Sequence, residues 1–178
     1  MRARSLVALA LLAVASPLTA QTVMGDMHRD VNEVQKKILD LANAIPADKY
    51  DWAPPGARSI GQVLIHIAAD NYYIPIDMGK PAPAATAMVP GDYKTVLAYE
   101  ARKLTKEQII AELTASFTHL HQAMGLTTDQ NLQSPMKFFG QDFTRSRAMV
   151  STVTHLHEHL GQMIAYARSN NIVPPWSK

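Results

Sequence analysis

The segment RSRAMVSTVTHLHEHLGQMIAYARS, residues 145–169, has the clearest helical pattern in the chain. Its apolar side chains recur at steps of three and four residues, which is the spacing of one buried face of an α-helix. These side chains are Met149, Val153, Leu156, Leu160, Met163 and Ala167. Asn170, Asn171 and the prolines Pro174 and Pro175 follow the pattern and disfavour a longer helix. The segment therefore predicts a long helix that packs against other helices.

The remaining sequence predicts further helices and no convincing strand. Helical periodicity recurs in residues 27–44, 59–75 and 105–124, and a shorter helical piece covers about 93–103. Asp26 is the expected N-cap of the first of these helices. Two helices open with a capping box, formed by Ser59 with Gln62 and by Thr105 with Gln108. With long aperiodic connections at 79–91 and 126–143, the pattern predicts an all-α fold, a four-helix bundle with two long connections.

The first twenty residues have the composition of a secretory signal peptide. Arg2 and Arg4 supply a positive start, residues 5–16 are mostly Leu, Ala and Val, and cleavage is expected after Ala20. The apolar run spans about a dozen residues, fewer than the roughly 20 that cross a bilayer; a retained N-terminal anchor is the alternative. We therefore expect residues 21–178 to form one domain that is periplasmic or secreted and does not span the membrane.

Charge and cysteine content narrow the classes of function. The chain has 17 basic and 15 acidic residues, and two of the basic residues lie in the predicted signal peptide. The remainder is balanced, so nothing in the sequence predicts nucleic-acid binding. The chain has no cysteine, which excludes disulfides, thiolate ligands and lipoprotein attachment through a cysteine. About 158 residues suffice for one domain that a hydrophobic core holds together.

Three histidines are candidate metal ligands. His155 and His159 are four residues apart in a predicted helix, so both rings project from one face and can reach the same cation. His66, in another predicted helix, is the third candidate. Three imidazoles with one open position form a catalytic or ligand-accepting site of the zinc type. His157 falls on a different face and is excluded; the alternative is that each histidine is bonded separately at the edge of the core.

Other polar residues give weaker signals. Asp70, one helical turn beyond His66, either orients an imidazole or is a solvated carboxylate. Tyr73 is a candidate lining residue of a pocket, and the alternative is that its ring only packs against its neighbours. His119 and His121 are two residues apart and cannot share a helix face; we interpret His121 as a structural residue that approaches the core.

Three strings together resemble the DinB-like family: SIGQVLIHI at 59–67, HLHEHLGQM at 155–163 and RSNNIVPP at 168–175. The resemblance covers most of the chain after the predicted signal peptide. Members of this family are four-helix bundles, often dimeric, with one histidine on the second helix and an H-x-x-x-H pair on the last. The resemblance implies a metal site formed by His66, His155 and His159. Leu160 departs from the family, in which many members have arginine at this position.

The family resemblance leaves the activity open, because fold is a weak guide to function. Some relatives resemble thiol S-transferases or thiol-dependent isomerases, and the predicted export argues against a cytosolic thiol cofactor. Our leading hypothesis is an exported protein that binds one divalent metal, zinc or nickel, and acts as a transferase or hydrolase on a small molecule. The alternatives are a non-enzymatic metal- or ligand-binding bundle with a structural or sensory role, and a vestigial triad in a protein that acts through partner contacts. A homodimer is expected from the resemblance alone.

Overall fold

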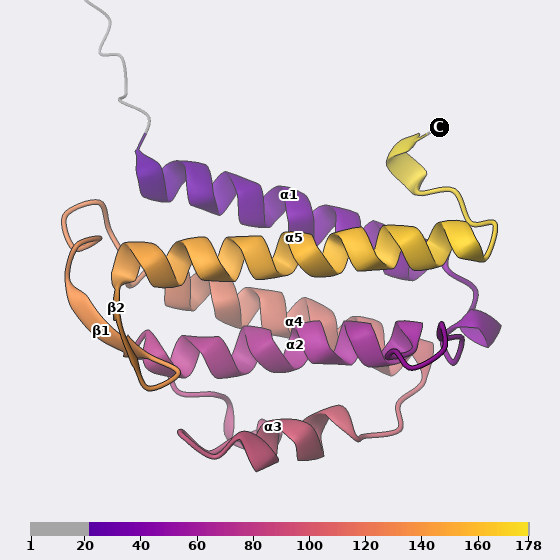
Figure 1. Cartoon of the computed structure of the whole chain (residues 1–178), viewed down its shortest axis with the longest axis horizontal. Helices are drawn as coiled ribbons and strands as arrows, with labels where there is room; N and C mark the ends of the chain where they lie inside the picture. Colours follow the sequence, from indigo (N-terminus) through magenta and orange to yellow (C-terminus); the bar gives the residue numbers. More distant parts are fainter. Residues whose placement is uncertain (1–21, 178) are drawn as a thin grey trace, which may run out of the picture.

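The computed structural model describes residues 22–177, and the predicted signal peptide lies outside this range. The described residues form five α-helices and one small β-hairpin (Figure 1). The helices are α1 (Val23–Ala44), α2 (Ile60–Asp77), α3 (Tyr93–Glu100), α4 (Lys106–Met124) and α5 (Arg145–Ser169). The strands are β1 (Pro135–Phe138) and β2 (Gln141–Thr144), and short 3-10 turns cover Ala47–Lys49, Ala84–Thr86 and Pro175–Ser177. The prediction of a mostly helical bundle is confirmed.

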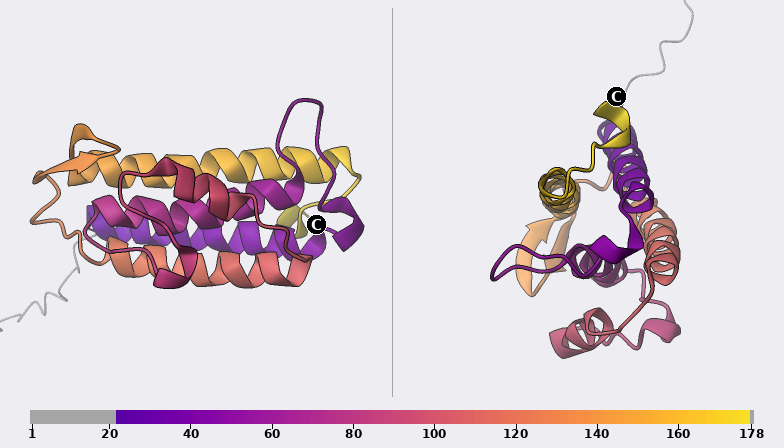
Figure 2. Two further views of the ribbon diagram at one scale, coloured as in Figure 1. Left: turned by 90° about the horizontal axis from the view of Figure 1, so that it is seen from below. Right: turned by 90° about the vertical axis from the view of Figure 1, so that its right-hand side faces the viewer.

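The four long helices pack around one interior, and the short helix α3 lies outside them. α2 contacts α4 and α5, and α1 contacts the same two helices. Figure 2, seen along the bundle, shows α3 beyond α2, on the side away from α1. The hairpin covers one end of the bundle, where it contacts both α2 and α5 (Figure 1). Within residues 22–177, no helix has the length and apolar character needed to cross a membrane.

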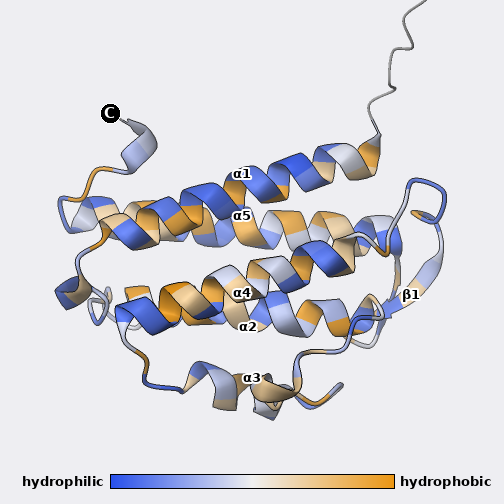
Figure 3. Ribbon diagram, turned by 180° about the vertical axis from the view of Figure 1, so that it is seen from behind, coloured by the Kyte–Doolittle hydropathy of each residue, from blue (hydrophilic) through white to orange (hydrophobic). Residues whose placement is uncertain are grey.

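The core is built from the apolar stripes that the sequence predicts. In α1 the stripe Val31, Val34, Ile38 and Leu41 is buried, while the opposite face is hydrophilic (Figure 3). Phe117, Leu113 and Leu120 of α4 are fully buried in the same core. Each fully buried side chain of this size stabilises the fold by about 1.5–3 kcal/mol. Tertiary packing therefore holds these helices in place more than their intrinsic propensity does.

Helix α2 is buried on nearly its whole circumference. From Ile60 to Pro75, every residue except Gln62 is buried. Neighbours on all sides explain this burial, because α4, α5, α3 and the hairpin all contact α2. The polar side chains of this helix, among them His66 and Asp70, are consequently buried as well. Such side chains need partners within the protein.

The helix boundaries follow the predicted caps with one exception. Both capping boxes form, at Ser59 with Gln62 and at Thr105 with Gln108. The predicted N-cap Asp26 is wrong, since α1 starts at Val23 and Thr22 Oγ1 accepts a hydrogen bond from the backbone N–H of Gly25 at 3.0 Å. A threonine side chain, like that of an aspartate, can accept a hydrogen bond from a free N–H group at a helix start.

The segment 126–143 is not the irregular connection that we predict, because it contains the β-hairpin. Pro135 pairs with Thr144, and Phe138 pairs with Gln141. The two-residue turn has positive φ at Phe139 (48°) and Gly140 (75°), as a primed hairpin turn requires. The backbone N–H of Phe139 donates to Asp77 Oδ2 at 2.8 Å. This hydrogen bond ties the hairpin tip to the end of α2.

Candidate metal centre

Three imidazoles from two helices meet at one point inside the bundle. His66 comes from α2, and His155 and His159 come from α5. Each residue has a ring nitrogen within 4.8 Å of a ring nitrogen of the other two. The ring centroids of His66 lie 5.6 Å from His155 and 4.7 Å from His159, and the α5 pair is 4.4 Å apart. The predicted convergence of the triad is confirmed, and exposed His157 bonds instead to the Val153 carbonyl.

Glu100 fixes the ring of His66. Nδ1 of His66 lies 2.7 Å from Glu100 Oε1, and an ionised carboxylate only accepts hydrogen bonds, so Nδ1 carries the donated proton. In a neutral ring, Nε2 is then left with a free lone pair. The second oxygen of Glu100 accepts from Arg58 Nη2 at 3.3 Å. This pairing leaves His66 Nε2 as the available metal ligand.

A second hydrogen-bond chain fixes His159. Its Nδ1–H donates to Gln162 Oε1 at 3.0 Å, and the amide nitrogen of Gln162 donates to the Tyr166 hydroxyl at 2.9 Å. The Tyr166 ring in turn packs edge-on against Trp52, with centroids 5.4 Å apart. Gln162 therefore has both its rotamer and its amide orientation set by neighbours. The consequence is that His159 presents Nε2 to the interior.

The Nε2 atom of His159 is buried and, within the described residues, has no hydrogen-bond partner. A buried nitrogen lone pair without a partner is costly in a folded protein. Burial lowers the pKa of His159 below its ordinary value of 6.5, more than the hydrogen bond to Gln162 raises it. The ring is therefore held neutral, which is the form that binds a metal.

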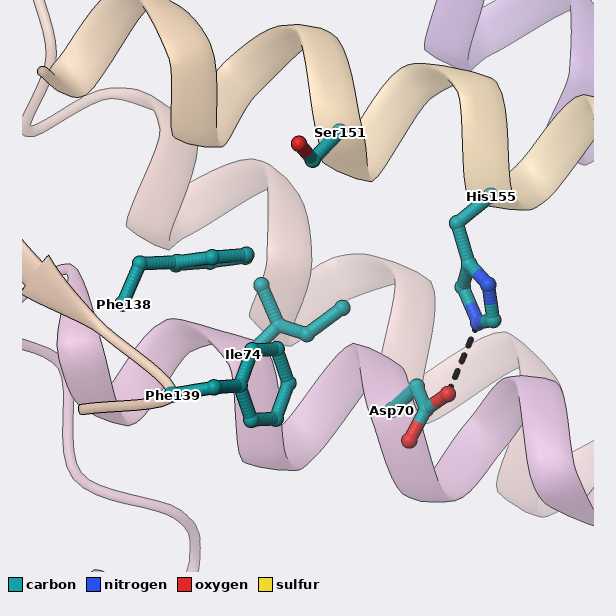
Figure 4. A pocket seen from close by; sticks show the side chains of 6 residues that line it. All are labelled: Asp70, Ile74, Phe138, Phe139, Ser151 and His155. Carbon is teal, nitrogen blue, oxygen red and sulfur yellow. Dashed lines mark hydrogen bonds and ion pairs between the residues drawn. The ribbon is translucent and has the colours of Figure 1, made fainter. Parts of the chain in front are cut away.

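Asp70 lies within the histidine group and is not a solvated carboxylate. Its Oδ2 atom is 2.7 Å from Nε2 of His155 and 3.4 Å from Nε2 of His66. The shorter of these two contacts is a hydrogen bond that His155 Nε2–H donates to Asp70 Oδ2 (Figure 4). One carboxylate oxygen thus lies beside two of the three candidate ligands. Of the two sequence interpretations, the orienting role fits this position.

Two sets of side chains have the proximity that a metal needs: His66 with His155 and His159, and His66 with Asp70 and Glu100. The second set is a poorer site, because Glu100 bonds to Nδ1 of His66 and therefore lies on the opposite side of the ring from Nε2. Only the three-histidine set also explains the unpartnered Nε2 of His159. Imidazole ligands suit zinc, nickel, copper and iron, so this donor set fits a divalent transition metal.

A cavity of about 210 Å³ adjoins the triad on the His155 side. Its lining consists of Asp70, Ile74, Phe138, Phe139, Ser151 and His155 (Figure 4). The His155 side chain is 26% exposed, whereas that of His66 is 9% exposed. A small molecule can therefore approach the triad from this side. Tyr73 is not among the residues that line this cavity. Its ring packs against those of Tyr93 and Phe139, which is the alternative that the sequence left open.

The other buried histidines lie apart from the triad. His121 Nε2–H donates to Gln35 Oε1 at 2.7 Å, which confirms its structural interpretation. His119, for which the sequence gives no role, is the more buried of the two. Its ring lies 5.4 Å from that of Tyr72, and its Nε2 has no hydrogen-bond partner among the described residues.

Two residues of the site have no role in the sequence interpretation. Gln162 follows His159 by three residues, and this spacing on one helix face can identify it. Glu100 is 34 residues away from His66 along the chain and has no comparable signal. Only the packing of α3 against α2 brings it to the site.

Comparison with known proteins identifies the family. A family model described as the DinB superfamily matches residues 31–163, and the chain belongs to this superfamily. The fold is similar to a DinB-like protein from Bacillus cereus, with a TM-score of 0.67 and 19% identity over 87% of this chain and 97% of that one. It is also similar to a conserved protein from Enterococcus faecalis, with a TM-score of 0.67 and 13% identity over 84% of this chain and 97% of that one. No curated protein matches the chain.

Proposed function

We propose that this DinB superfamily protein binds one divalent metal ion, zinc or nickel, through ring nitrogens of His66, His155 and His159. The observation that carries the proposal is the buried, unpartnered Nε2 of His159, whose other nitrogen is held by Gln162. The buried Nε2 of His119 also lacks a partner among the described residues, but only at His159 do ring nitrogens of two further histidines lie within 4.8 Å. A metal at this point supplies the missing partner.

The neighbouring side chains prepare the three rings for this role. Glu100 and Gln162 each accept the Nδ1 proton of one ring and so direct its Nε2 inward. Metal binding through Nε2 of His155 would displace the proton that this nitrogen donates to Asp70 Oδ2. Asp70 then has a free acceptor oxygen at the mouth of the cavity. This oxygen can accept a proton or a hydrogen bond from a bound molecule.

We further propose a transferase or hydrolase reaction on a small molecule as the activity. The bound ion would act as a Lewis acid, polarising an oxygen or sulfur atom of that molecule. The cavity beside His155 supports this proposal over a purely structural site, which has all its positions filled by protein ligands. The signal-like composition of residues 1–20 supports the additional proposal that the protein works in the periplasm or outside the cell.

Elemental analysis of purified protein tests the metal site. We expect about one ion per chain in the wild type, and loss of that ion in the variants His155→Ala and His159→Ala. His157→Ala is the matched control, since His157 lies on the same helix but is exposed. Circular dichroism on each variant checks that the helices remain. Equal metal content in all four proteins would show that the triad is not the site.

A further inference from the structure

The cavity beside His155 has walls of two different kinds. Asp70, His155 and Ser151 give it polar groups, whereas Ile74, Phe138 and Phe139 form an apolar wall. Figure 4 shows the two phenylalanine rings at the end of the space opposite Asp70 and His155. A ligand that satisfies both walls has a polar end and an apolar end.

The volume limits the size of the apolar end. An apolar cavity of about 150 Å³ holds benzene, and drug-sized ligands occupy about 300–1,000 Å³. The cavity of about 210 Å³ therefore suits one ring or a branched alkyl group with a short polar extension. A longer chain would have to leave through the open side.

In the metal-free protein, the charge of the cavity lining disfavours an anionic ligand. Asp70 supplies a carboxylate, and no lysine or arginine is among the described residues that line the cavity. A second negative charge beside Asp70 is disfavoured by repulsion and by desolvation. The ligand is therefore expected to carry no negative charge where it contacts these side chains, and the proposed metal ion beside Asp70 would disfavour a positive charge.

The hairpin holds the apolar wall in place before any ligand arrives. Phe138 is buried and stacks on Phe143 with ring centroids 5.2 Å apart. Phe139 packs against Phe138 at 4.8 Å, and the hydrogen bond to Asp77 ties the tip to α2. The Phe139 residue is 50% exposed, so a ligand can cover part of its apolar surface. A preformed wall binds a ligand with little cost for ordering the protein.

We propose that this cavity binds an uncharged small molecule with one compact apolar group, of the size of a phenyl ring, held between Ile74, Phe138 and Phe139. The polar end of the molecule faces Asp70 and His155. The orientation of that end rests on the proposed metal function, whereas the binding of the apolar group does not. The inference assigns a substrate class to the site: small aryl or branched-alkyl compounds with a neutral polar end.

Saturation-transfer NMR on metal-free protein tests the apolar wall by itself. Benzyl alcohol is expected to give a signal that benzoate, its anionic counterpart, does not give. Phe139→Asn should remove most of this signal, because asparagine tolerates the positive φ of the turn but lacks the ring. Ser151→Leu, which fills the cavity, should weaken it too. The control Val173→Asn changes a residue that is 56% exposed outside the lining and should leave the signal unchanged.

Titration calorimetry on zinc-loaded protein tests the orientation. Benzamide should bind about tenfold or more tightly than acetamide, since burial of a ring has at least this effect. Phe139→Asn should bring the two affinities together. Equal binding of benzyl alcohol and benzoate, or a signal that survives both Phe139→Asn and Ser151→Leu, overturns the proposal. A chain that binds no zinc but still selects benzyl alcohol refutes the metal function and leaves the apolar site standing.

Discussion

The substitution Glu100→Gln tests whether the carboxylate on α3 supports the metal site. It preserves an oxygen that can accept from His66 Nδ1–H at the present distance of 2.7 Å but removes the charge. A hydrogen bond to a charged group contributes about 1.5–3 kcal/mol and a neutral one about 1 kcal/mol. The Glu100 side chain is only 13% exposed, so solvent screens little of this difference. Arg58 shares the charge through the other oxygen, and we expect a loss of about 1–2 kcal/mol in metal binding.

This loss corresponds to a zinc affinity about five- to thirtyfold weaker than that of the wild type. Competition with a chromophoric chelator at fixed pH measures the affinity directly. Glu112→Gln is the matched control, because Glu112 is also a partly buried carboxylate that accepts a hydrogen bond, from the Tyr99 hydroxyl at 2.5 Å. Glu112 lies outside the histidine cluster, so the zinc affinity of Glu112→Gln should stay within about twofold of that of the wild type.

Two results would refute the reasoning. If Glu100→Gln binds zinc as tightly as the wild type, the carboxylate does not tune the His66 ring. If Glu112→Gln loses as much affinity as Glu100→Gln, the effect is a general response to lost negative charge. Urea unfolding of the metal-free variants separates both cases from a loss of stability.

Four further predictions concern stability and processing. Burial lowers the pKa of His119 below its ordinary value of 6.5, so this histidine binds a proton more readily in the unfolded chain than in the folded protein. The free energy of unfolding should therefore fall as the pH drops below 6.5. Urea titrations at several pH values should show a smaller fall in His119→Gln than in the wild type. Gly140→Ala should destabilise the metal-free protein by about 1–2 kcal/mol, because φ is 75° there. Gly161→Ala, in a helix with open space around the position, should stabilise it by about 0.5–1 kcal/mol in the same urea assay. Mass spectrometry of protein from the periplasm of a Gram-negative host should find Gln21 as the first residue. A protein that still carries residues 1–20 would contradict the predicted cleavage.

The parts of the fold that follow local rules are predictable from the sequence. The apolar period and the terminating residues predict the last helix over residues 145–169, and the helix has these bounds in the structure. The sequence does not predict the hairpin, since its strands have four residues each and offer too few positions for an alternating pattern. Its turn also places a phenylalanine, Phe139, at positive φ, where bulky residues are rare.

The candidate site likewise contains some residues that the sequence predicts and others that it does not. His155 and His159 are recognisable because four residues make one helical turn, and Asp70 follows His66 by the same spacing. Glu100 reaches His66 only because the connection before α3 folds this short helix back onto α2. The apolar wall of the cavity depends likewise on the unexpected hairpin. Sequence therefore predicts contacts within one helix, and tertiary packing supplies the others.

The charges around the triad favour a bound cation over a purely hydrogen-bonded histidine cluster. Two carboxylates, Asp70 and Glu100, contact the rings at 2.7 Å. Among the ion pairs of residues 22–177, Arg58 is the only permanently charged cation paired with either carboxylate, and it pairs with Glu100. With neutral imidazoles, the site therefore holds one more negative charge than positive charge in a buried place, which is unfavourable. A divalent ion beside Asp70 reverses this imbalance and gives the inward nitrogen of His159 its partner.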